Sequence, residues 1–574
     1  MKTSWGETLD VNNILPEYPR PQMKRARYLI LNGAWEYAIT KAGDEPEAYD
    51  GTILVPFSPE CELSGVMRQL SPCETLWYRR TFARPSDWPS GRTLLHFGAV
   101  DQTAEVFLNG HKLGSHTGGY AAFSFDMTEL IREDNVLTVK VTDVTDASHH
   151  ARGKQKTARG GIWYTPQSGI WQTVWAEPIP EAYVERLRIV PLFDESAVEI
   201  TAFAAGGEAL PYTVRFEEKR VAGTAGAPVR LALKSFTPWS PENPKLYEFE
   251  VDLGEDTVQS YFAMRKFSVE KDGEDIPRLF LNNRPYFHNG VLDQGYWPDG
   301  LYTAPSDEAM VADILTMKRL GFNTLRKHIK IEPMRWYYHC DRLGMLVWQD
   351  MPNGGGRYRS TVVSLPALVG SFLGDEERSY RRFAREDAAG RAQYSVELRE
   401  MIHQLVNCPS IAVWVPFNEG WGQFDAKRAY GEILAIDATR TIDHASGWHD
   451  QGVGEIQSLH IYFRPYRHEK DRLGRVVLLS EFGGYNCRVS GHCFNEKDFG
   501  YRRFQSAGAL LAAFRALYEN EIIPAKGRGL AAAIYTQLSD VEDELNGFLT
   551  YDRAVAKLPE AEVRALMDRL CEEN

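Results

Sequence analysis

The sequence lacks several features that mark special classes of protein. No apolar run approaches the roughly 18–20 residues that a membrane-spanning helix needs. The opening segment, MKTSWGETLDVNN, has no basic stretch followed by an apolar one, so no signal peptide is visible. The seven cysteines show no C-x-x-C spacing, and an odd count in a large chain favours free thiols in a reducing compartment. These absences together predict a cytoplasmic location and no membrane partner.

Long runs of one charge are also absent. The 574 residues carry a formal net charge of −13 that is spread along the chain. A basic face for nucleic acid is therefore not expected, whereas a neutral solute is compatible with this balance. Aromatic residues make up 12% of the chain, which suits stacking on sugars, although large buried cores explain most of them. At this length the chain should hold several domains.

Residues 1–180 alternate in the manner of short β-strands. In NVLTVKVTDV, Leu137 and Val139 fall on one face and polar residues on the other. Asn109-Gly110 lies between apolar flanks, which is a strong signal for a tight hairpin. Long loops separate these strands, so the sequence predicts a jelly-roll β-sandwich over residues 1–180.

Residues 181–268 keep the β-type alternation, but the loops differ. Phe249 and Val251, for example, alternate with Glu250 and Asp252. A stretch of about 90 residues with several such strands fits a small immunoglobulin-like β-sandwich.

From residue 269 to residue 574, strand-like and helical segments alternate. Ser306 can cap a helix with an acidic first turn, and Gly321 can end it. Such an alternation over roughly 300 residues predicts a C-terminal (β/α)8 TIM barrel, whose chemistry sits at the C-terminal ends of the strands. The eight strand-like segments are PYFHNGV, FNTLRKH, GMLVWQD, IAVWVPFNE, RTIDHASG, QSLHIYF, VVLLSE and LAAAIYTQ.

Two of these segments end in a carboxylate, Glu419 in the fourth and Glu481 in the seventh. An apolar run of this length, bounded by glycine, indicates a strand buried on both faces, with the glutamate at its edge. One such glutamate alone is usually a solvated surface charge. Two of them on strands of one barrel supply the paired carboxyls that glycoside cleavage needs.

The chain resembles glycoside hydrolase family 2, the family of β-galactosidases, β-glucuronidases and β-mannosidases. The family's order of domains, sugar-binding jelly roll, immunoglobulin-like domain and barrel, matches the three regions above. The resemblance extends over nearly the whole length and rests on the segments YPRPQMKRARYLILNGAWEYAI, SGIWQTVW, WSPENPKLY, LGMLVWQDMP, VWVPFNEGWGQ, VVLLSEFGGY and IYTQLSDVEDELNGFLTYDR.

The resemblance implies a role for each glutamate. The family's general acid/base is the glutamate of an Asn-Glu pair, here Asn418-Glu419, and its nucleophile is the glutamate of strand seven, here Glu481. Asn418 resembles the residue that hydrogen-bonds the sugar 2-hydroxyl. A retaining glycosidase needs two carboxyls about 5–5.5 Å apart. The charge of the nucleophile and partial burial should both raise the pKa of the proton donor.

Further substrate-binding candidates lie near the ends of other strands. The resemblance implies an arginine near the nucleophile, here Arg326, and a histidine or tyrosine that touches the sugar or the nucleophile, here His460 or Tyr462. A histidine satisfied within the core is the competing interpretation for His460. Asp350 could bind hydroxyls or cap a loop, and Trp448 could wall the site or only pack. The full set is Arg326, His328, Asp350, Trp448, His460 and Tyr462.

Strand eight departs from the family pattern. The best-known members end it with a tryptophan beneath the sugar, where this chain has Tyr535, and Gln537 and Asp540 could supply polar contacts instead. Glucuronidases bind the substrate carboxylate with an Asn-x-Lys pair after this strand, and DVEDELNGFLTYDR contains no such pair. The magnesium ligands of the long β-galactosidases do not map onto this chain. We therefore expect no metal and no cofactor.

The leading hypothesis is a retaining exo-glycosidase that removes a terminal β-linked sugar from an oligosaccharide or glycoside, with a β-galactoside as the default substrate. The same mechanism on a β-glucuronide, a galactofuranoside or an α-L-arabinoside is the enzymatic alternative, since L-arabinopyranose shares the ring geometry of galactose. A transglycosylase would share the covalent intermediate. A non-catalytic carbohydrate-binding relative belongs to a different class, and the two intact glutamates argue against it.

The segment of residues 353–379 follows strand three and should lie over the active-site face. It either shapes the site for the leaving group or contacts a second subunit. Family members are commonly dimers or tetramers, so the resemblance leaves a homo-oligomer open.

Overall fold

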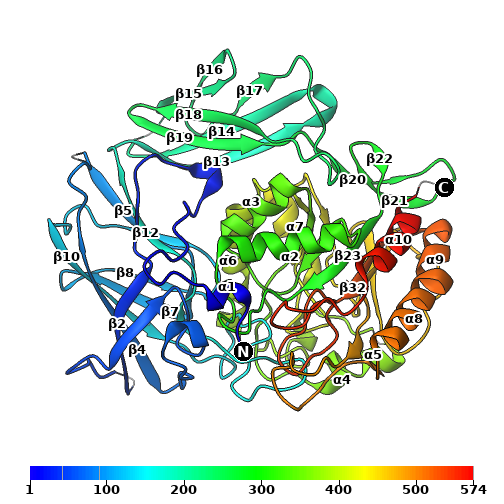
Figure 1. Ribbon diagram of the computed structural model, residues 1–574. Helices are drawn as coiled ribbons and strands as arrows, with labels where there is room; N and C mark the ends of the chain where they lie inside the picture. The colour runs from blue at the N-terminus through cyan, green and yellow to red at the C-terminus, as the bar shows by residue number, and fades with distance from the viewer. Residues whose placement is uncertain (42, 90, 208, 371, 573–574) are drawn as a thin grey trace.

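The fold is that of a computed structural model, which describes residues 1–572 apart from residues 42, 90, 208 and 371 (Figure 1). Three bodies follow one another along the chain. A β-sandwich lies on the left in Figure 1, a smaller one lies at the top, and a ring of parallel strands surrounded by helices fills the centre and right. The multidomain fold predicted from the sequence, with two sandwiches followed by a TIM barrel, is confirmed.

The first body packs two main antiparallel sheets, ordered β1-β12-β5-β9 and β3-β2-β4-β10-β7-β8, around an apolar core. The predicted hairpin at Asn109-Gly110 joins β7 to β8, and both residues have positive φ, 52° and 82°, as a tight hairpin turn requires. The strands are β1 Leu29–Ile30, β2 Gly33–Lys41, β3 Gly51–Val55, β4 Glu74–Ala83, β5 Arg92–Phe97, β6 Val100–Asp101, β7 Thr103–Leu108, β8 His111–Thr117, β9 Phe123–Asp126, β10 Asp134–Thr142, β11 Gly169–Ile170 and β12 Val174–Ile179.

The second body is the smaller sandwich, with sheets ordered β13-β14-β17 and β16-β15-β18-β19. Alternating apolar residues such as Phe249 and Val251 point into its core, as the sequence pattern predicts. The strands are β13 Tyr183–Leu192, β14 Ala197–Ala205, β15 Pro211–Phe216, β16 Lys219–Thr224, β17 Val229–Ala232, β18 Tyr247–Leu253 and β19 Asp256–Phe262.

Eight parallel strands form the barrel in the order β27-β26-β25-β24-β23-β32-β29-β28. All eight come from the eight segments expected from the sequence. Within the part of the chain that the structure describes, β27 and β28 share no hydrogen-bonded ladder, so the ring has one seam. The strands are β23 His288–Asp293, β24 Thr324–Lys327, β25 Leu346–Asp350, β26 Ile411–Val415, β27 Thr441–Ile442, β28 Ile456–Ile461, β29 Val476–Gly483 and β32 Leu530–Thr536.

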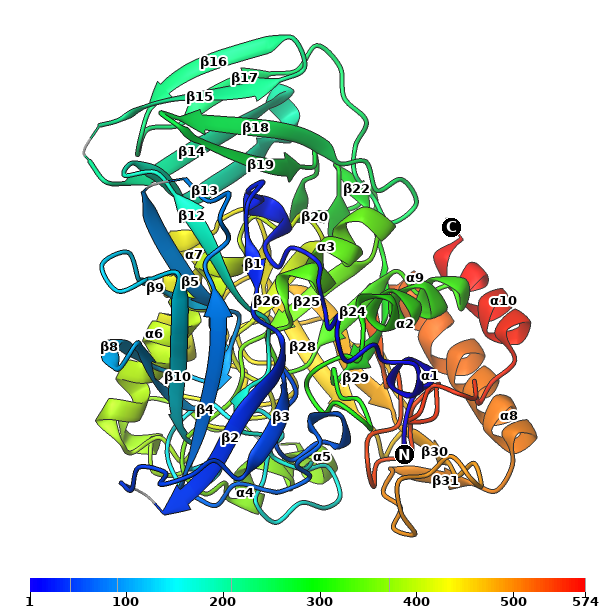
Figure 2. The same cartoon turned by 60° about the vertical axis from the view of Figure 1, so that its left-hand side comes forward.

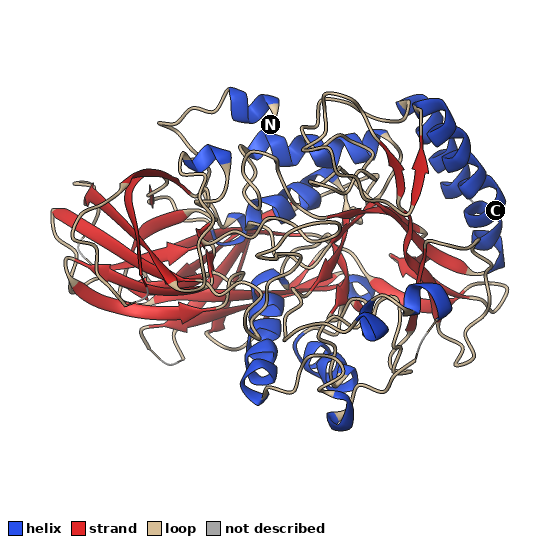
Figure 3. Ribbon diagram, turned by 90° about the horizontal axis from the view of Figure 1, so that it is seen from below, coloured by secondary structure: helices blue, strands red, loops and turns tan. Residues whose placement is uncertain are grey.

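Helices cover the outside of the barrel, and Figure 3 separates this helix-covered part from the strand-rich first body. Ser306 caps α2 by accepting a hydrogen bond from Ala309 N, and the helix ends before Gly321, as expected. The helices of more than one turn are α2 Asp307–Arg319, α3 Met334–Leu343, α6 Ala388–Leu405, α7 Ala426–Ile436, α8 Ala507–Leu517, the π-helical turn η5 Tyr518–Ile522, α9 Ile523–Arg528 and α10 Glu560–Cys571.

The expected alternation of strand and helix is interrupted at the seam. Between β27 and β29 the described residues form no helix, although β28 lies between those strands. Gly447, Gly452 and Gly454 in this region all have positive φ, which a helix does not accommodate. Two single-turn helices, α4 Ser360–Val363 and α5 Pro366–Val369, lie in the segment after β25.

A small hairpin closes the end of the barrel opposite the carboxyl ends of its strands. It comprises β20 Phe267–Lys271, β21 Pro277–Leu281 and β22 Arg284–Pro285. Its Leu279 and Leu281 share one apolar cluster with barrel residues such as Trp348. Because this end is filled by packed side chains, a site can form only at the other end.

The three bodies pack against one another, as Figure 2 shows from a second direction. Arg25, 5% exposed, lies between the first two bodies. Its Nη1 lies 3.0 Å from Glu177 Oε2 of β12, and its Nη2 lies 2.8 Å from Asp256 Oδ2 of β19. No helix among the described residues is long and apolar enough to cross a membrane.

Candidate active site

The two glutamates singled out from the sequence occupy the carboxyl end of the barrel. Glu419 follows β26 in a loop and adopts a left-handed backbone conformation, with φ of 50°. Its backbone N–H donates to Ser446 O at 2.9 Å, which anchors this loop to the loop after β27. Glu481 lies inside β29 rather than at its tip, because that strand continues to Gly483.

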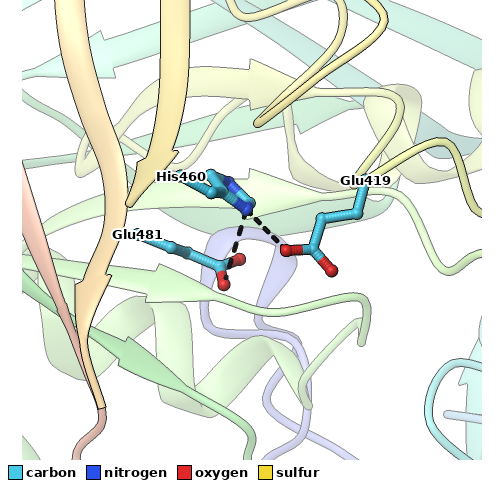
Figure 4. Close-up of side chains that lie close together, drawn as sticks. All are labelled: Glu419, His460 and Glu481. Carbon is cyan, nitrogen blue, oxygen red and sulfur yellow. Dashed lines mark hydrogen bonds and ion pairs between the residues drawn. The ribbon is translucent and has the colours of Figure 1, made fainter. Parts of the chain in front are cut away.

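His460 joins the two glutamates, and Figure 4 shows the three side chains pointing toward one another. Its Nδ1 lies 2.8 Å from Glu419 Oε1 and 3.7 Å from Glu481 Oε2. One ligand atom from each of the three side chains lies within 4.8 Å of the other two. A carboxyl oxygen of Glu419 therefore faces one of Glu481 across a gap of less than 5 Å.

Arg326 lies beneath this group and is fully buried. Its Nε and Nη2 donate to the two oxygens of Asp350 at 3.0 Å each. Its Nη1 donates to Glu481 Oε1 at 3.1 Å, and its Nη2 also donates to Asn418 Oδ1 at 2.8 Å. The guanidinium thus offsets two buried carboxylates and fixes the residue before Glu419.

Hydrogen bonds to Arg326 also set the tautomer of His460. Arg326 Nη1 lies 3.3 Å from His460 Nε2, and a guanidinium can only donate. Nε2 therefore accepts, and the imidazole proton is assigned to Nδ1, which donates to Glu419 Oε1. Burial lowers the pKa of His460 to about 4, so the ring is neutral at neutral pH.

Burial raises the pKa of Glu419 to about 8. Lys154 and Arg326 oppose this rise in pKa, whereas Glu544 adds to it. Glu419 is therefore protonated at neutral pH, as a proton donor must be. Glu481 has different neighbours from those of Glu419. Arg326 donates a hydrogen bond to one of its carboxylate oxygens, and the Tyr462 hydroxyl donates to the other.

The remaining candidates mostly gather around this centre. His328 Nδ1 lies 2.9 Å from Asp350 Oδ2. Trp448 Nε1 donates to the backbone carbonyl of Glu419 at 3.0 Å. Gln537 follows β32, and its Nε2 donates to Asn546 Oδ1 at 2.8 Å.

Tyr535 is the one candidate that the structure does not bring to this centre. Its side chain is buried with Phe482, Phe514 and Phe548, and its hydroxyl accepts from the backbone N–H of Tyr485. Side chains alternate across a strand, so Tyr535 points toward the helices while its neighbour Thr536 faces the site. Thr536 Oγ1 lies 3.0 Å from the hydroxyl of Tyr462.

Two residues near the site had no signal in the sequence. Tyr501 stacks on Tyr462 with ring centroids 3.7 Å apart. Lys154 comes from the first body, and its ammonium lies 3.7 Å from the carboxylate of Glu544 in the loop after β32. Glu544 falls within the segment IYTQLSDVEDELNGFLTYDR that carries the family resemblance, but only the packing of the first body on the barrel brings Lys154 to it.

Glu419, His460 and Glu481 are also close enough to hold a metal ion, and among the described residues they are the one group with that property. Each of the three already has a hydrogen-bond partner within the site. The same arrangement also suits acid/base chemistry by paired carboxyls.

Three family models match this chain. The model described as glycosyl hydrolase 2 galactose-binding domain-like matches residues 66–170, the glycosyl hydrolases family 2 model matches residues 182–265, and the TIM barrel domain model of the same family matches residues 275–478. Together these ranges cover more than half of the chain.

Curated relatives match at low identity. A β-galactosidase of Thermoanaerobacter pseudethanolicus is 24% identical over 385 residues, which cover 63% of this chain and 47% of that protein. A putative β-glucuronidase of Formosa agariphila is 26% identical over 367 residues, covering 60% and 39% respectively. The chain thus spans less than half the length of these curated relatives.

Solved structures share the fold over nearly the whole chain. The β-D-glucuronidase of Dictyoglomus thermophilum superposes with a TM-score of 0.73 at 17% identity, covering 97% of this chain and 99% of that one. A β-galacturonidase from Eisenbergiella tayi bound to galacturonate gives 0.70 at 19% identity, covering 96% and 99%. With three models of one family matched in order along it, the chain belongs to glycoside hydrolase family 2.

Proposed function

We propose that this protein is a retaining exo-glycosidase that hydrolyses a terminal β-linked sugar, with Glu481 as nucleophile and Glu419 as general acid/base. The separation of the two carboxyls carries the proposal. Their oxygens lie within 4.8 Å of each other. Retaining enzymes hold these groups about 5–5.5 Å apart, whereas inverting enzymes leave about 6.5–9.5 Å for a water molecule.

The first step forms a covalent glycosyl-enzyme. Glu481 attacks the anomeric carbon as the bond to the leaving oxygen breaks, and Glu419 transfers its proton to that oxygen. Among the described residues, Glu419 Oε2 has no hydrogen-bond partner, whereas Oε1 accepts from His460. We therefore assign the transferred proton to Oε2.

The second step returns the enzyme to its starting state. Once the charge of Glu481 is taken up in the ester bond, the environment of Glu419 is less negative and its pKa falls. Glu419 then removes a proton from water, which attacks the anomeric carbon and releases Glu481. The two displacements give net retention.

The proposed substrate is a β-galactoside, as for the relatives named β-galactosidase. A β-glucuronide is the second candidate, because other similar proteins carry the name β-glucuronidase. The same mechanism could also cleave galactofuranosides and α-L-arabinosides.

A panel of p-nitrophenyl glycosides tests this proposal. We expect turnover of at least one member, a product of retained anomeric configuration by NMR, and a loss of at least about 10³-fold in kcat/KM for E481Q. A 2-deoxy-2-fluoro substrate analogue should label the peptide that contains Glu481. Inverted product, or sugar binding without hydrolysis across the panel, would overturn the proposal.

A further inference from the structure

One loop of the first body reaches the carboxyl end of the barrel. It connects β10 to β11 and is held from both sides. The backbone N–H of Arg152 donates to Asn353 O after β25 at 2.9 Å. Arg159 Nη1 donates to Asp543 Oδ1 after β32 at 2.9 Å. The segment between these two anchors contains Lys154.

The glycine that precedes Lys154 fixes the backbone at this position. Gly153 has φ of 59°, and a Cβ added to it would lie 2.9 Å from Ile329 O, so this position accepts only glycine. Lys154 is 5% exposed, and its Nζ lies 3.7 Å from Glu544 Oε2. Among the described residues its ammonium makes no hydrogen bond, so a buried group with three donors has none of them used.

Hydrogen bonds to both carboxylate oxygens fix the side chain of Glu544. It is 1% exposed, its Oε2 accepts from the hydroxyl of Tyr164, and its Oε1 accepts from Asn546 Nδ2 at 3.1 Å. Because each carboxylate oxygen can accept two hydrogen bonds, both oxygens keep capacity for a ligand. Lys154 and Glu544 thus present donors and acceptors side by side.

Hydrogen bonds and one stretch of backbone connect this pair to Glu481. Asn546, which donates to Glu544, accepts from Gln537 at 2.8 Å. Gln537 follows Thr536, whose Oγ1 lies 3.0 Å from the hydroxyl of Tyr462, and that hydroxyl donates to Glu481.

On the side of the proton donor, Lys154 Nζ lies 6.0 Å from the ring centroid of Trp421, two residues after Glu419. Of the charged groups, Lys154 acts most strongly on the pKa of Glu419, ahead of Arg326. The pair therefore lies beside the loop that carries Glu419, and its Glu544 side is linked to the strand end that contacts Tyr462.

We propose that Lys154 and Glu544 form a clamp that binds two neighbouring hydroxyl groups of a neutral sugar and rejects a uronate. This inference rests on the proposed function and names its substrate class. One hydroxyl accepts from the ammonium, and the other donates to the carboxylate. Losing either hydroxyl leaves a buried charged group with an unused bond, which such sites penalise strongly.

A uronate should be repelled by this clamp. Its carboxylate could approach Lys154 only by lying beside Glu544, and two buried like charges repel each other. The clamp therefore separates this chain from similar proteins named glucuronidase or galacturonidase, although the fold is shared.

A double-mutant cycle between side chain and sugar tests the clamp. K154M and E544Q are assayed with the wild-type protein on the best glycoside of the panel, on its monodeoxy analogues and on the matching uronide. Assays run at pH 6, where Glu419 is protonated. K156M is the matched control, because Lys156 lies on the same loop and, among the described residues, its ammonium forms no ion pair and lies 5.5 Å from the ring centroid of Trp163.

In the wild type, removal of either of two neighbouring hydroxyls should lower kcat/KM by about 10²–10⁴-fold. In K154M the penalty should fall below about tenfold only for the hydroxyl that accepts from Lys154, and in E544Q only for the hydroxyl that donates to Glu544, because each variant has lost the partner of one hydroxyl. E544Q should also raise the ratio of uronide to neutral-sugar turnover, and K156M should match the wild type. Deoxy penalties that are the same in wild type and both variants, or a wild-type preference for the uronide, would overturn the clamp.

The clamp has a readout that does not depend on turnover. In an E481Q background, calorimetric titration with the free monosaccharide should show that K154M weakens binding at least about tenfold, while K156M does not. A protein that hydrolyses no glycoside but shows this pattern refutes the proposed function and keeps the clamp. A protein that hydrolyses members of the panel but shows additive deoxy penalties supports the proposed function and refutes the clamp.

Discussion

The protonation of Glu419 is set by its surroundings. Burial raises its pKa to about 8, Lys154 pulls the pKa down and Glu544 pushes it up. In the proposed mechanism Glu419 must be protonated in the first step, so kcat/KM should fall about tenfold per pH unit above that pKa.

The first prediction follows from these signs. K154M removes a nearby positive charge, so it should move the alkaline limb of the kcat/KM profile to higher pH. E544Q removes a negative charge and should move the limb to lower pH. The measurement is kcat/KM from pH 5 to pH 10, with K156M as control. If the alkaline limbs of the wild type, K154M, E544Q and K156M coincide, these charges do not set the pKa of Glu419.

The second prediction concerns Arg326. R326M should lower the free energy of unfolding by about 3–5 kcal/mol, because Asp350 and Glu481 are left buried without their cation. R79M is the control, since the side chains of Arg79 and Glu36 are 40% and 48% exposed, and it should cost no more than about 1 kcal/mol. Urea denaturation measures both variants. Equal costs would argue against a structural role for the buried network.

At the residue scale the sequence indicated most of the site. Glu419, Glu481 and Arg326 follow or lie in apolar strands that lead to one end of the barrel, so their meeting could be expected. Tyr535 and Thr536 show the limit of this reasoning. Which of two adjacent residues faces inward depends on strand register, and here Thr536 lies beside Tyr462 whereas Tyr535 packs among aromatic side chains.

Elements depend on backbone positions as well as on side chains. Helix α3 ends at Gly344, which adopts a left-handed conformation with φ of 74° and donates its N–H to Cys340 O. A Cβ on Gly344 would lie 2.4 Å from Pro241 O, which belongs to the loop between β17 and β18 of the second body. One glycine thus ends a helix and allows close packing.

The third prediction compares two glycines. G344A should lower the free energy of unfolding by about 2–3 kcal/mol, from the left-handed backbone and the clash together. G254A has a similar backbone, with φ of 57°, but open space around it, and should cost about 1 kcal/mol. Chemical denaturation of both variants is the measurement. A G344A variant no less stable than G254A would refute the packing argument.

At the element scale, barrel strands such as β26 and β29 were predictable because buried parallel strands are nearly continuous apolar runs. The seam was not. β27 is only Thr441–Ile442, and a strand that short leaves little trace in the sequence. The missing helices around β28 were equally hidden, since glycine-rich loops of this length are compatible with either outcome.

For the whole molecule, Arg25 links the first two bodies through Glu177 and Asp256. The fourth prediction is that R25M lowers the free energy of unfolding by about 3–5 kcal/mol and splits the calorimetric transition, because two buried carboxylates lose their shared cation. R79M removes an exposed pair, Arg79 with Glu36, within the first body and should leave a single transition. An unsplit R25M transition at the wild-type temperature would contradict this coupling.

The order of bodies along the chain followed from pattern changes in the sequence, but their mutual contacts did not. Lys154 and Tyr164 meet Glu544 only because the loop after β10 crosses to the barrel. Such contacts join residues far apart in sequence, and no local periodicity reports them.

That crossing has a consequence during protein synthesis. A ribosome makes Tyr164 some 380 residues before Glu544, and at about 5–20 residues per second the interval is roughly 20 to 80 seconds. Throughout that time the early loop lacks its acidic counterpart. A prematurely terminated product that stops before Glu544 therefore lacks the acidic half of the proposed clamp, so the clamp can form only after synthesis has passed the last barrel strand.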